Sequence, residues 1–370
     1  MIIGVPREVK TEEYRVGLTP FCVHELVNHG HHVVVEHDAG IGIGFDDEAY
    51  REAGAHILAK PEMIWEKADM IVKVKEPQPA EFPFLRENLV LFTYLHLAPD
   101  LTQAEALIKS KCIAIAYETV TDKSGGLPLL SPMSQVAGRL SIQVGSASLE
   151  KSHGGSGVLL GGVPGVFPGK VTVVGGGVVG TNAVRMAMGR EAQVTVLDTS
   201  LNRLQELDLQ FGGRLNTVYS TIASLEEHIA SSDLVIGAVL LPGRAAPKLI
   251  KRHMLSKMKP GSVIVDVAID QGGCVETAKA TTHKNPTYVV DGVVHYCVAN
   301  MPGAVPRTAT LALNNATLPY IIRLANQGYQ KALRNDKHFC DGLNVCRGVI
   351  TNPDVAEALQ KPYVPAMDIL

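Results

Sequence analysis

The sequence lacks a strong net charge and any long run of residues of one charge sign. Its 370 residues include 34 lysines and arginines against 37 aspartates and glutamates, which gives a formal net charge of −3 and a pI of about 6.5. Nucleic acids and anionic membranes attract proteins mainly through clustered positive charge. The composition therefore predicts that neither nucleic acid nor a membrane is a main partner.

The sequence also lacks a hydrophobic run long enough to cross a membrane, for which a helix needs about 20 consecutive apolar residues. The longest weakly charged region, residues 152–169, is broken by many glycines and by two prolines. The chain opens on the strand-like residues 1–5, MIIGV, so we expect no signal peptide. We predict a soluble globular protein of the cytoplasm.

Cysteine pairs and metal motifs are missing as well. Six cysteines are scattered along the chain without C-x-x-C or zinc-ligand spacing. We interpret them as reduced thiols of a cytoplasmic protein, although Cys340 and Cys346 are close enough in sequence to pair. No cluster of histidine, cysteine and glutamate has metal-ligand spacing, and no G-x-S-x-G nucleophile motif occurs. The sequence therefore predicts neither a metal centre nor a hydrolase with that motif.

What the sequence does contain is a glycine motif between a strand pattern and a helix pattern. Residues 170–180, KVTVVGGGVVG, end a β-branched run in G-x-G-x-x-G, and an apolar helix-forming segment, 183–187, follows. Gly175 permits the tight turn, Gly177 lets the backbone approach a pyrophosphate, and Gly180 lets the helix pack close to the sheet. The first turn of that helix offers unpaired N–H groups and a partial positive charge to the phosphates.

A second valine-rich run, residues 194–197, ends in Asp198. An acid about 20 residues beyond the glycine motif is placed to accept hydrogen bonds from an adenosine ribose. A glycine motif alone is weak evidence, because glycine-rich turns are common in loops. Here a strand, the glycines, a helix, a second strand and a terminal acid occur in order, so the segment predicts dinucleotide binding.

Strand and helix patterns alternate along the rest of the chain, which is typical of mostly parallel sheets covered by helices. We expect Thr19 to cap and Pro20 to open a helix that Gly30 ends. The segment 101–109 has a helical pattern. Strand-like runs lie at residues 32–35, 70–74, 90–94 and 113–117 in the first part, and at 171–174, 194–197, 234–236, 263–265 and 288–290 after the glycine motif begins.

Two long helical segments, residues 131–151 and 307–326, flank the part of the chain that carries the glycine motif. A chain that leaves one domain, builds another and returns needs two such crossings. We therefore predict an α/β fold with two doubly wound Rossmann-like domains. The first domain is expected to consist of residues 1–130 and 306–370, and the dinucleotide-binding domain, residues 131–305, is inserted into it.

Polar residues follow several of the predicted strands. Lys75 ends the run 70–74, and His96 follows residues 91–95, so both project from one sheet edge if these strands are parallel neighbours. Asp270 lies just past a buried strand, at the carboxyl edge where ligands of α/β sheets bind. Taken singly, a snorkelling lysine, a core histidine and a solvated loop acid are the ordinary interpretations. Their joint position makes them candidate site residues.

The chain resembles the alanine dehydrogenases, a family that includes the NAD-binding subunit of nicotinamide nucleotide transhydrogenase. The similar stretches are spread over essentially the whole chain. They are residues 2–20 (IIGVPREVKTEEYRVGLTP), 72–77 (VKVKEP), 91–98 (LFTYLHLA), 130–138 (LSPMSQVAG), 154–162 (GGSGVLLGG), the glycine motif, 237–247 (GAVLLPGRAAP), 265–273 (VDVAIDQGG) and 298–308 (VANMPGAVPRT).

The resemblance implies reversible oxidative deamination of L-alanine to pyruvate and ammonium, with NAD as cofactor, by a cytoplasmic homohexamer. It makes His96 and Asp270 catalytic, with Arg15 and Lys75 as substrate-binding residues. These residue types suit the chemistry, since a histidine transfers protons near neutral pH and a guanidinium matches a carboxylate. The implied NAD contacts are Ser134, Gly175, Gly177, Val178, Val179, Gly180, Asp198, Arg203, Ser220, Val239, Leu240, Val267, Ala268, Ile269, Asp270, Lys279, Val298, Ala299, Asn300 and Met301.

Lys279 stands where the family usually has an arginine, and a lysine cannot form the same bidentate contact. Two other functions remain open at this point. A transhydrogenase-like NAD(H)-binding subunit would have no amino-acid site and should lack the pair formed by Lys75 and His96. A saccharopine-type dehydrogenase would act on a larger substrate, and only an assay separates it from an alanine dehydrogenase.

Overall fold

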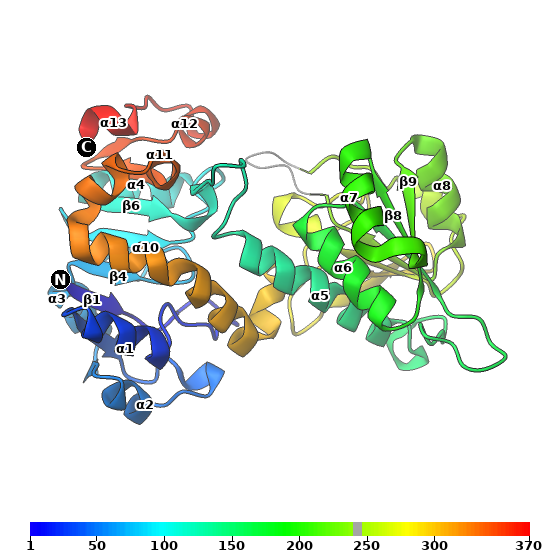
Figure 1. Ribbon diagram of the computed structural model, residues 1–370, viewed down its shortest axis with the longest axis horizontal. Helices are drawn as coiled ribbons and strands as arrows, with labels where there is room; N and C mark the ends of the chain where they lie inside the picture. The colour runs from blue at the N-terminus through cyan, green and yellow to red at the C-terminus, as the bar shows by residue number, and fades with distance from the viewer. Residues whose placement is uncertain (240–245) are drawn as a thin grey trace. The chain divides into compact units, whose positions relative to one another are not determined.

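The structure is a computed structural model that describes residues 1–239 and 246–370 (Figure 1). The described residues divide by their internal contacts into two compact units. Unit 1 comprises Met1–Met133 and Val305–Leu370, and unit 2 comprises Ser134–Ala304. Each unit is a mostly parallel sheet with helices against it, so the predicted α/β class with two Rossmann-like domains is confirmed.

The sheet of unit 1 has the strand order β15-β14-β6-β5-β4-β1-β2-β3 within the described residues. The six described strands from β6 to β3 in this order are parallel to one another, whereas β14 is antiparallel to β6 and β15 is antiparallel to β14. Their bounds are β1 Ile2–Val5, β2 His32–Glu36, β3 His56–Leu58, β4 Met70–Val72, β5 Val90–Thr93, β6 Ile113–Ala116, β14 Leu343–Cys346 and β15 Val349–Ile350.

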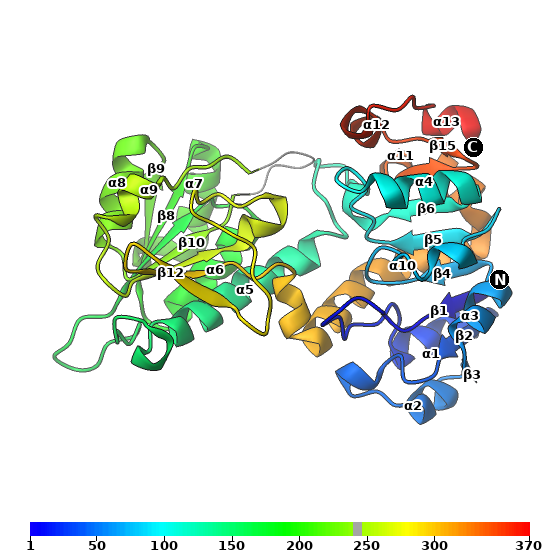
Figure 2. The same ribbon diagram turned by 180° about the vertical axis from the view of Figure 1, so that it is seen from behind.

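Helices cover both faces of this sheet. In Figure 1, α1 and α10 lie in front of the strands of unit 1, and the reverse view of Figure 2 shows α3 and α4 on the other face. A buried apolar cluster joins α3, α4 and α12 to the sheet. The helices are α1 Pro20–Asn28, α2 Asp47–Glu52, α3 Pro61–Lys67, α4 Leu101–Ser110, α10 Pro306–Arg334, α11 Lys337–Cys340, α12 Pro353–Leu359 and α13 Ala366–Ile369, with the 3₁₀ turns η1 Ile41–Ile43, η2 Phe82–Phe84 and η3 Tyr117–Thr119.

Two helix predictions differ from the structure in detail. Thr19 precedes α1 with the extended backbone of an N-cap, but its side chain makes no capping hydrogen bond. Its hydroxyl lies 3.5 Å from the Cys22 sulfur instead, so the predicted Thr19 cap is wrong in its hydrogen bond. The last long helix continues to Arg334, with a break at Gly328, where φ is +74°. A left-handed residue of this kind is easy for glycine and interrupts the helical hydrogen bonds.

The sheet of unit 2 has the order β12-β13-β11-β10-β7-β8-β9 among described residues, and only the edge strand β12 runs antiparallel to its neighbour. The strands are β7 Lys170–Val174, β8 Gln193–Asp198, β9 Leu215–Tyr219, β10 Leu234–Gly237, β11 Val263–Asp266, β12 Thr287–Val290 and β13 Val293–Tyr296. The helical segments are α5 Ser131–Ser148, α6 Val178–Gly189, α7 Leu201–Phe211, α8 Ile222–Ser231 and α9 Arg252–Leu255, with η4 Lys151–His153, η5 Gly212–Arg214, η6 Val267–Gln271 and η7 Met301–Ala304.

All six cysteines are buried and carry free thiols, so Cys340 and Cys346 are not paired. The described residues contain no helix with the length and apolar character that crossing a membrane requires.

Candidate active site

The glycine loop of unit 2 connects β7 to α6, as its sequence predicts. Gly175 has a φ of +99°, a conformation that L-residues with a side chain rarely adopt. A Cβ atom on Gly180 would lie 1.8 Å from the carbonyl oxygen of Gly175, so only glycine permits the close packing of α6 on the loop. Gly177 occupies the N-cap position of α6. The first turn of α6 therefore directs its N–H groups toward the loop.

Asp198 and Arg203 hold this loop from the neighbouring strand and helix. Asp198 ends β8, and its Oδ2 accepts a hydrogen bond of 2.7 Å from the Gly176 N–H. The Arg203 Nε donates to the Gly176 carbonyl oxygen at 2.7 Å. The other carboxylate oxygen of Asp198 accepts from the Ser200 N–H at 2.8 Å. Both predicted cofactor residues thus lie against the glycine loop.

The arrangement fits a dinucleotide. A Cβ atom on Gly177 would meet no atom within 4 Å, so the protein itself leaves room beside the N-terminus of α6. A pyrophosphate at that position would receive backbone N–H groups and the positive end of the helix dipole. The ionised carboxylate of Asp198 has lone pairs beyond those its two N–H partners use, and these can accept ribose hydroxyl groups.

Other predicted cofactor residues surround the loop. Val239 is close to it, because a Cβ atom on Gly175 would lie 3.0 Å from the Val239 Cγ2. The Ser220 N–H donates to the Asp198 carbonyl oxygen at 2.9 Å. Ser134 lies on α5, one turn before Gly138, whose close packing against the Val179 carbonyl oxygen brings α5 next to α6.

For two of the predicted NAD contacts, Lys279 and Leu240, the described residues show no side-chain contact with the glycine loop. Lys279 is exposed, and its backbone N–H donates to the Tyr288 hydroxyl at 2.7 Å. Leu240 lies outside the residues that the structure describes.

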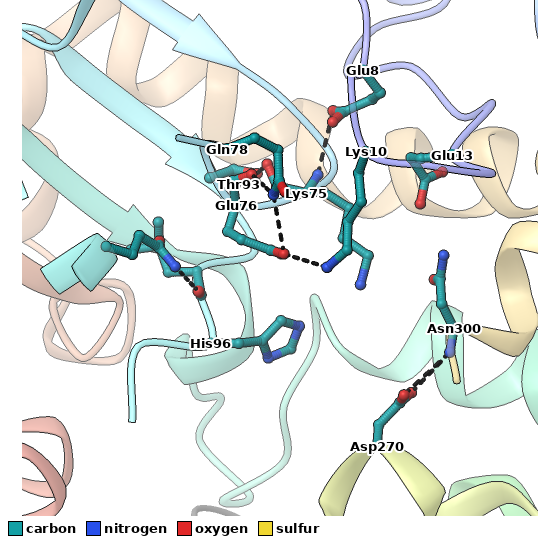
Figure 3. A network of polar contacts seen from close by, with 12 residues as sticks. Glu8, Lys10, Glu13, Lys75, Glu76, Gln78, Thr93, His96, Asp270 and Asn300 are labelled. Carbon is teal, nitrogen blue, oxygen red and sulfur yellow. Dashed lines mark hydrogen bonds and ion pairs between the residues drawn. The ribbon is translucent and has the colours of Figure 1, made fainter. Parts of the chain in front are cut away.

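Asp270 lies in η6, directly after β11. Its carboxylate accepts from the Asn300 backbone N–H, at 3.1 Å to Oδ1 and 3.4 Å to Oδ2, and Figure 3 shows this contact. This hydrogen bond therefore connects residues 267–270 with residues 298–301, two segments that are both predicted to contact NAD. Asp270 is exposed, so its carboxylate is open to a ligand.

Asp266, at the end of β11, binds the backbone of the loop that carries Asp270. This carboxylate is buried and accepts hydrogen bonds from the backbone N–H groups of Ala268, Cys274 and Val275. Burial raises the pKa of Asp266, and these hydrogen bonds offset part of the rise. The residue fixes the backbone that carries Asp270.

In unit 1, Lys75 and His96 follow adjacent strands. β4 and β5 pair in parallel through Met70↔Val90 to Val72↔Phe92, and each of the two residues lies three positions beyond its strand. The Thr93 hydroxyl donates to the Lys75 carbonyl oxygen at 2.9 Å and links the two strand ends. The expectation that both residues project from one sheet edge is met by this pairing.

A buried charge network supports the strand end before Lys75. The fully buried Lys73 ammonium lies 3.1 Å from Glu8 and 2.8 Å from Glu81. Burial opposes the charge on Lys73, but the two carboxylates outweigh it and raise the pKa of the lysine. Glu8 also accepts from the Val74 N–H at 2.7 Å and from the Lys75 N–H at 3.3 Å. The backbone of Lys75 is therefore tied to a carboxylate from the loop after β1.

Glu76 and Lys10 lie beside Lys75 (Figure 3). Lys10 forms an ion pair with the largely buried Glu76. Burial acts to raise the pKa of Glu76, but the positive charges of Lys75 and Lys10 hold it below its ordinary value. The strand end at Lys75 therefore carries lysine and glutamate side chains at short range.

His96 presents an exposed imidazole from a fixed backbone. Its side chain is 47% exposed, and its ring stacks on that of Tyr94 with a centroid distance of 5.7 Å. The backbone N–H of His96 donates to the Glu118 Oε1 at 2.6 Å. The ring is accessible to a ligand, whereas the main chain that carries it is not free to move.

Arg15 is buried, at 3% exposure, in the loop between β1 and α1. Its Nε and Nη2 donate to the two carboxylate oxygens of Glu13 at 2.6 and 2.5 Å. Nη1 donates to the Met133 sulfur at 3.2 Å. A thioether is a weak acceptor.

Sequence reasoning missed Glu13, Glu118 and Asp266 as residues that hold the predicted site groups. Glu118 was detectable by the rule that singled out His96, because it too follows a strand-like run of unit 1. Glu13 is two residues from Arg15, but its bidentate contact depends on the fold of the loop. Sequence spacing also did not indicate the group His37, Asp38 and Asp47, of which His37 is exposed and whose potential ligand atoms lie within 4.8 Å of one another.

Unit 2 has the glycine loop, helix N-terminus and strand-end acid of a dinucleotide-binding α/β protein, and unit 1 adds a sheet edge with a lysine and a histidine. Such proteins are typically oxidoreductases that use a nicotinamide cofactor.

Comparison of the chain with models of protein families identifies its family. Residues 4–137 match the N-terminal domain and residues 141–353 the C-terminal domain of the family described as alanine dehydrogenase/PNT. The chain belongs to this family.

Similar proteins extend over the full chain. A curated alanine dehydrogenase from Halomonas elongata is 59% identical over 370 residues, which is all of both chains. A solved structure titled L-alanine dehydrogenase has 53% identity and a TM-score of 0.95, with 97% of this chain and 99% of that chain covered. A transhydrogenase structure from Sinorhizobium meliloti has 26% identity and a TM-score of 0.84, with 95% of this chain and all of that chain covered.

Proposed function

We propose that this chain is an NAD-dependent L-alanine dehydrogenase. It converts L-alanine, NAD and water reversibly into pyruvate, ammonium, NADH and a proton. The observation that carries the proposal is the 59% identity with a curated alanine dehydrogenase over the complete length of both chains. The presence of Lys75 and His96 on neighbouring strand ends supports an amino-acid site in addition to a nucleotide site.

The deciding experiment is the oxidation of NADH by the purified protein with two substrate pairs. Pyruvate with ammonium should be turned over, and 2-oxoglutarate with lysine should not. A saccharopine-type enzyme would show the opposite preference, and a transhydrogenase-like subunit would bind NADH without using either pair. Failure to oxidise NADH with pyruvate and ammonium, in a protein that binds NADH, contradicts the proposal.

We propose that unit 2 binds NAD through the residues that surround its glycine loop. The phosphates would meet the loop and the first turn of α6, and Asp198 would meet the adenosine ribose. When bound, NAD accepts the hydride from the Cα atom of alanine. The full set is the one implied by the resemblance: Ser134, Gly175, Gly177–Gly180, Asp198, Arg203, Ser220, Val239, Leu240, Val267–Asp270, Lys279 and Val298–Met301.

The residues of unit 1 would bind the substrate. Arg15 would hold the substrate carboxylate, because a planar guanidinium suits a carboxylate. Lys75 would donate to the oxygen of pyruvate and to the corresponding group of the amino acid.

Deamination also needs proton transfers. Loss of a hydride from Cα and of a proton from nitrogen gives an imine, water adds to its carbon, and ammonia leaves as pyruvate forms. We propose that His96 takes and returns the protons of these steps and that Asp270 is the second catalytic group. A positioned acid or base of this kind contributes about 10²- to 10⁴-fold to a rate.

The variant Asp198→Ala should narrow the preference of the enzyme for NAD over NADP. An ionised Asp198 favours ribose hydroxyl groups and repels a 2′-phosphate. Loss of a hydrogen bond to a charged group costs about 1.5–3 kcal/mol, so kcat/KM with NAD should fall by about 10-fold or more. The same assays with NADP provide the control, because damage to the glycine loop would lower both values. Comparable kcat/KM for both cofactors in the unmodified enzyme would contradict the role of Asp198.

The variant Lys75→Ala should lower kcat/KM for pyruvate by about 10- to 10²-fold, with KM and kcat both affected. The reason is that the proposed lysine contact exists in the ground state and in the transition state. Lys10→Ala is the matched control, because Lys10 forms the ion pair with Glu76 but is not assigned a substrate contact. Steady-state kinetics with varied pyruvate give the result. A Lys75→Ala enzyme with unchanged kcat/KM would remove Lys75 from the substrate site.

We propose that the protein assembles as a homohexamer in the cytoplasm, as the family resemblance implies. The free thiols of all six cysteines are compatible with a reducing compartment. Residues 158–167 of unit 2 expose several apolar side chains around a small antiparallel hairpin at Val163 and Val166. Exposed apolar patches commonly mark interfaces, and we assign this one to a second copy of the chain.

The variant Phe167→Asp should therefore shift the protein toward smaller assemblies. Phe167 is 87% exposed, and a charge there would have to be buried in the proposed interface. Leu209→Asp is the control, because Leu209 is 79% exposed on α7, outside the hairpin. Light scattering coupled to size-exclusion chromatography measures the mass. A hexamer that persists in Phe167→Asp would exclude the hairpin from the interface.

A further inference from the structure

The backbone of His96 has a conformation that needs support. Its φ is +48°, in the left-handed region that residues with a side chain rarely adopt. Such a conformation costs on the order of 1 kcal/mol and persists only when neighbouring groups fix it.

Glu118 meets this backbone from the next strand. The residue lies in η3, directly after β6, which pairs in parallel with β5 up to Thr93↔Ala116. Its Oε1 accepts from both the Leu95 N–H at 3.1 Å and the His96 N–H at 2.6 Å. The Glu118 side chain is only 14% exposed, so water competes little for these bonds. Hydrogen bonds from backbone N–H groups to a carboxylate are stronger than those between neutral groups.

The rest of the turn is held by other contacts. The Tyr94 hydroxyl donates to the Leu129 carbonyl oxygen at 2.6 Å, and the Gln103 amide donates to the Leu95 carbonyl oxygen at 2.9 Å. These bonds fix the residues before His96. Of these three side chains, Glu118 is the one that binds the backbone of His96 itself, and its carboxylate also lies 3.9 Å from the imidazole Nδ1.

We infer that Glu118 is a positioning residue that acts through His96. It holds the left-handed turn by accepting the two backbone N–H groups, and thereby sets where the imidazole meets the substrate. This inference rests on the proposed role of His96 as the acid and base. Glu118 itself does not touch the substrate or the reacting atoms in this assignment.

Two substitutions separate position from charge. Glu118→Ala removes the acceptor and should lower kcat with pyruvate and ammonium by up to about 10²-fold, the effect of misplacing a reacting group by about 1 Å. KM for NADH should not change. Glu118→Gln keeps an oxygen where Oε1 accepts both N–H groups, so it should recover most of the lost kcat. A Glu118→Gln enzyme as slow as the alanine variant would overturn the positional role.

A matched control is available in unit 2. Glu150 lies 3.9 Å from the Nδ1 of the exposed His153, the same separation as in the Glu118 pair, but at a surface turn. Glu150→Ala and Glu150→Gln should leave kcat unchanged. Thermal unfolding and NADH fluorescence titration show whether each variant is folded. If Glu118→Ala does not fold, the glutamine variant and the combination with His96→Ala still decide the question.

Combining each Glu118 substitution with His96→Ala tests whether Glu118 affects kcat through His96. If Glu118 acts through His96, adding Glu118→Gln or Glu118→Ala to His96→Ala should change the residual kcat by less than about 3-fold. If the Glu118 substitution lowers kcat in the His96→Ala enzyme as much as it does in the enzyme that retains His96, Glu118 has a separate role and the inference is overturned. Near-native kcat in His96→Ala itself would instead contradict the proposed function of the histidine. The two failures are therefore distinguishable.

Discussion

Replacement of His96 by alanine is expected to lower kcat for pyruvate and ammonium by about 10²- to 10⁴-fold. The physical reason is that each direction of the reaction moves protons that a positioned imidazole would accept and return. The ring is accessible, at 47% exposure, while its backbone is held by Glu118. The effect should appear in kcat because the proton transfers belong to the chemical steps. Steady-state and single-turnover kinetics of NADH oxidation measure it.

The NADH affinity of the His96→Ala enzyme should stay close to that of the unmodified protein, because the proposed nucleotide contacts all lie in unit 2. His153→Ala is a matched control, since that histidine is also exposed and paired with a carboxylate. A His96→Ala protein with ordinary folding and near-native turnover would falsify the assignment. The histidine would then be a residue of the turn without a catalytic role.

The parts of the site that follow a repeating pattern were predictable from sequence. The β-branched run 170–174, the glycines and Asp198 define a local unit whose geometry the structure reproduces. The placement of Lys75 and His96 followed from one topological rule, that neighbouring parallel strands end at the same edge of a sheet. The pairing of β4 with β5 confirms that rule here.

The parts that depend on distant segments were not predictable in the same way. Strand β14 pairs with β6 across more than two hundred positions of sequence, and β15 pairs with β14. No local sequence pattern predicts such a sheet edge. Lys73 looks like an ordinary strand residue, yet it is fully buried between carboxylates that come from other loops. The predicted capping hydrogen bond of Thr19 does not form, because its hydroxyl contacts the Cys22 sulfur and its backbone N–H donates to Asn314. Side-chain networks of this kind are set by tertiary structure.

Replacement of Asp270 by asparagine is expected to lower kcat by about 10²- to 10⁴-fold, as for the histidine. Asparagine has nearly the same shape and keeps one oxygen that can accept from the Asn300 N–H, now bonded at 3.1 Å. The loop should therefore remain in place while the charge and the proton-accepting capacity are lost. Kinetics with pyruvate and ammonium, together with NADH titration, separate these effects.

Two further aspartates of unit 2 make the experiment specific. Asp291→Asn removes a surface carboxylate that pairs with Arg252, and it should leave kcat unchanged. Asp266→Asn should act differently, because an amide N–H group would face one of the three backbone N–H groups that the carboxylate now accepts. That variant should weaken NADH binding and lower the thermal unfolding temperature. If Asp270→Asn instead keeps near-native kcat, its carboxylate supports the Asn300 turn alone, and the proton transfers must be assigned to His96 without it.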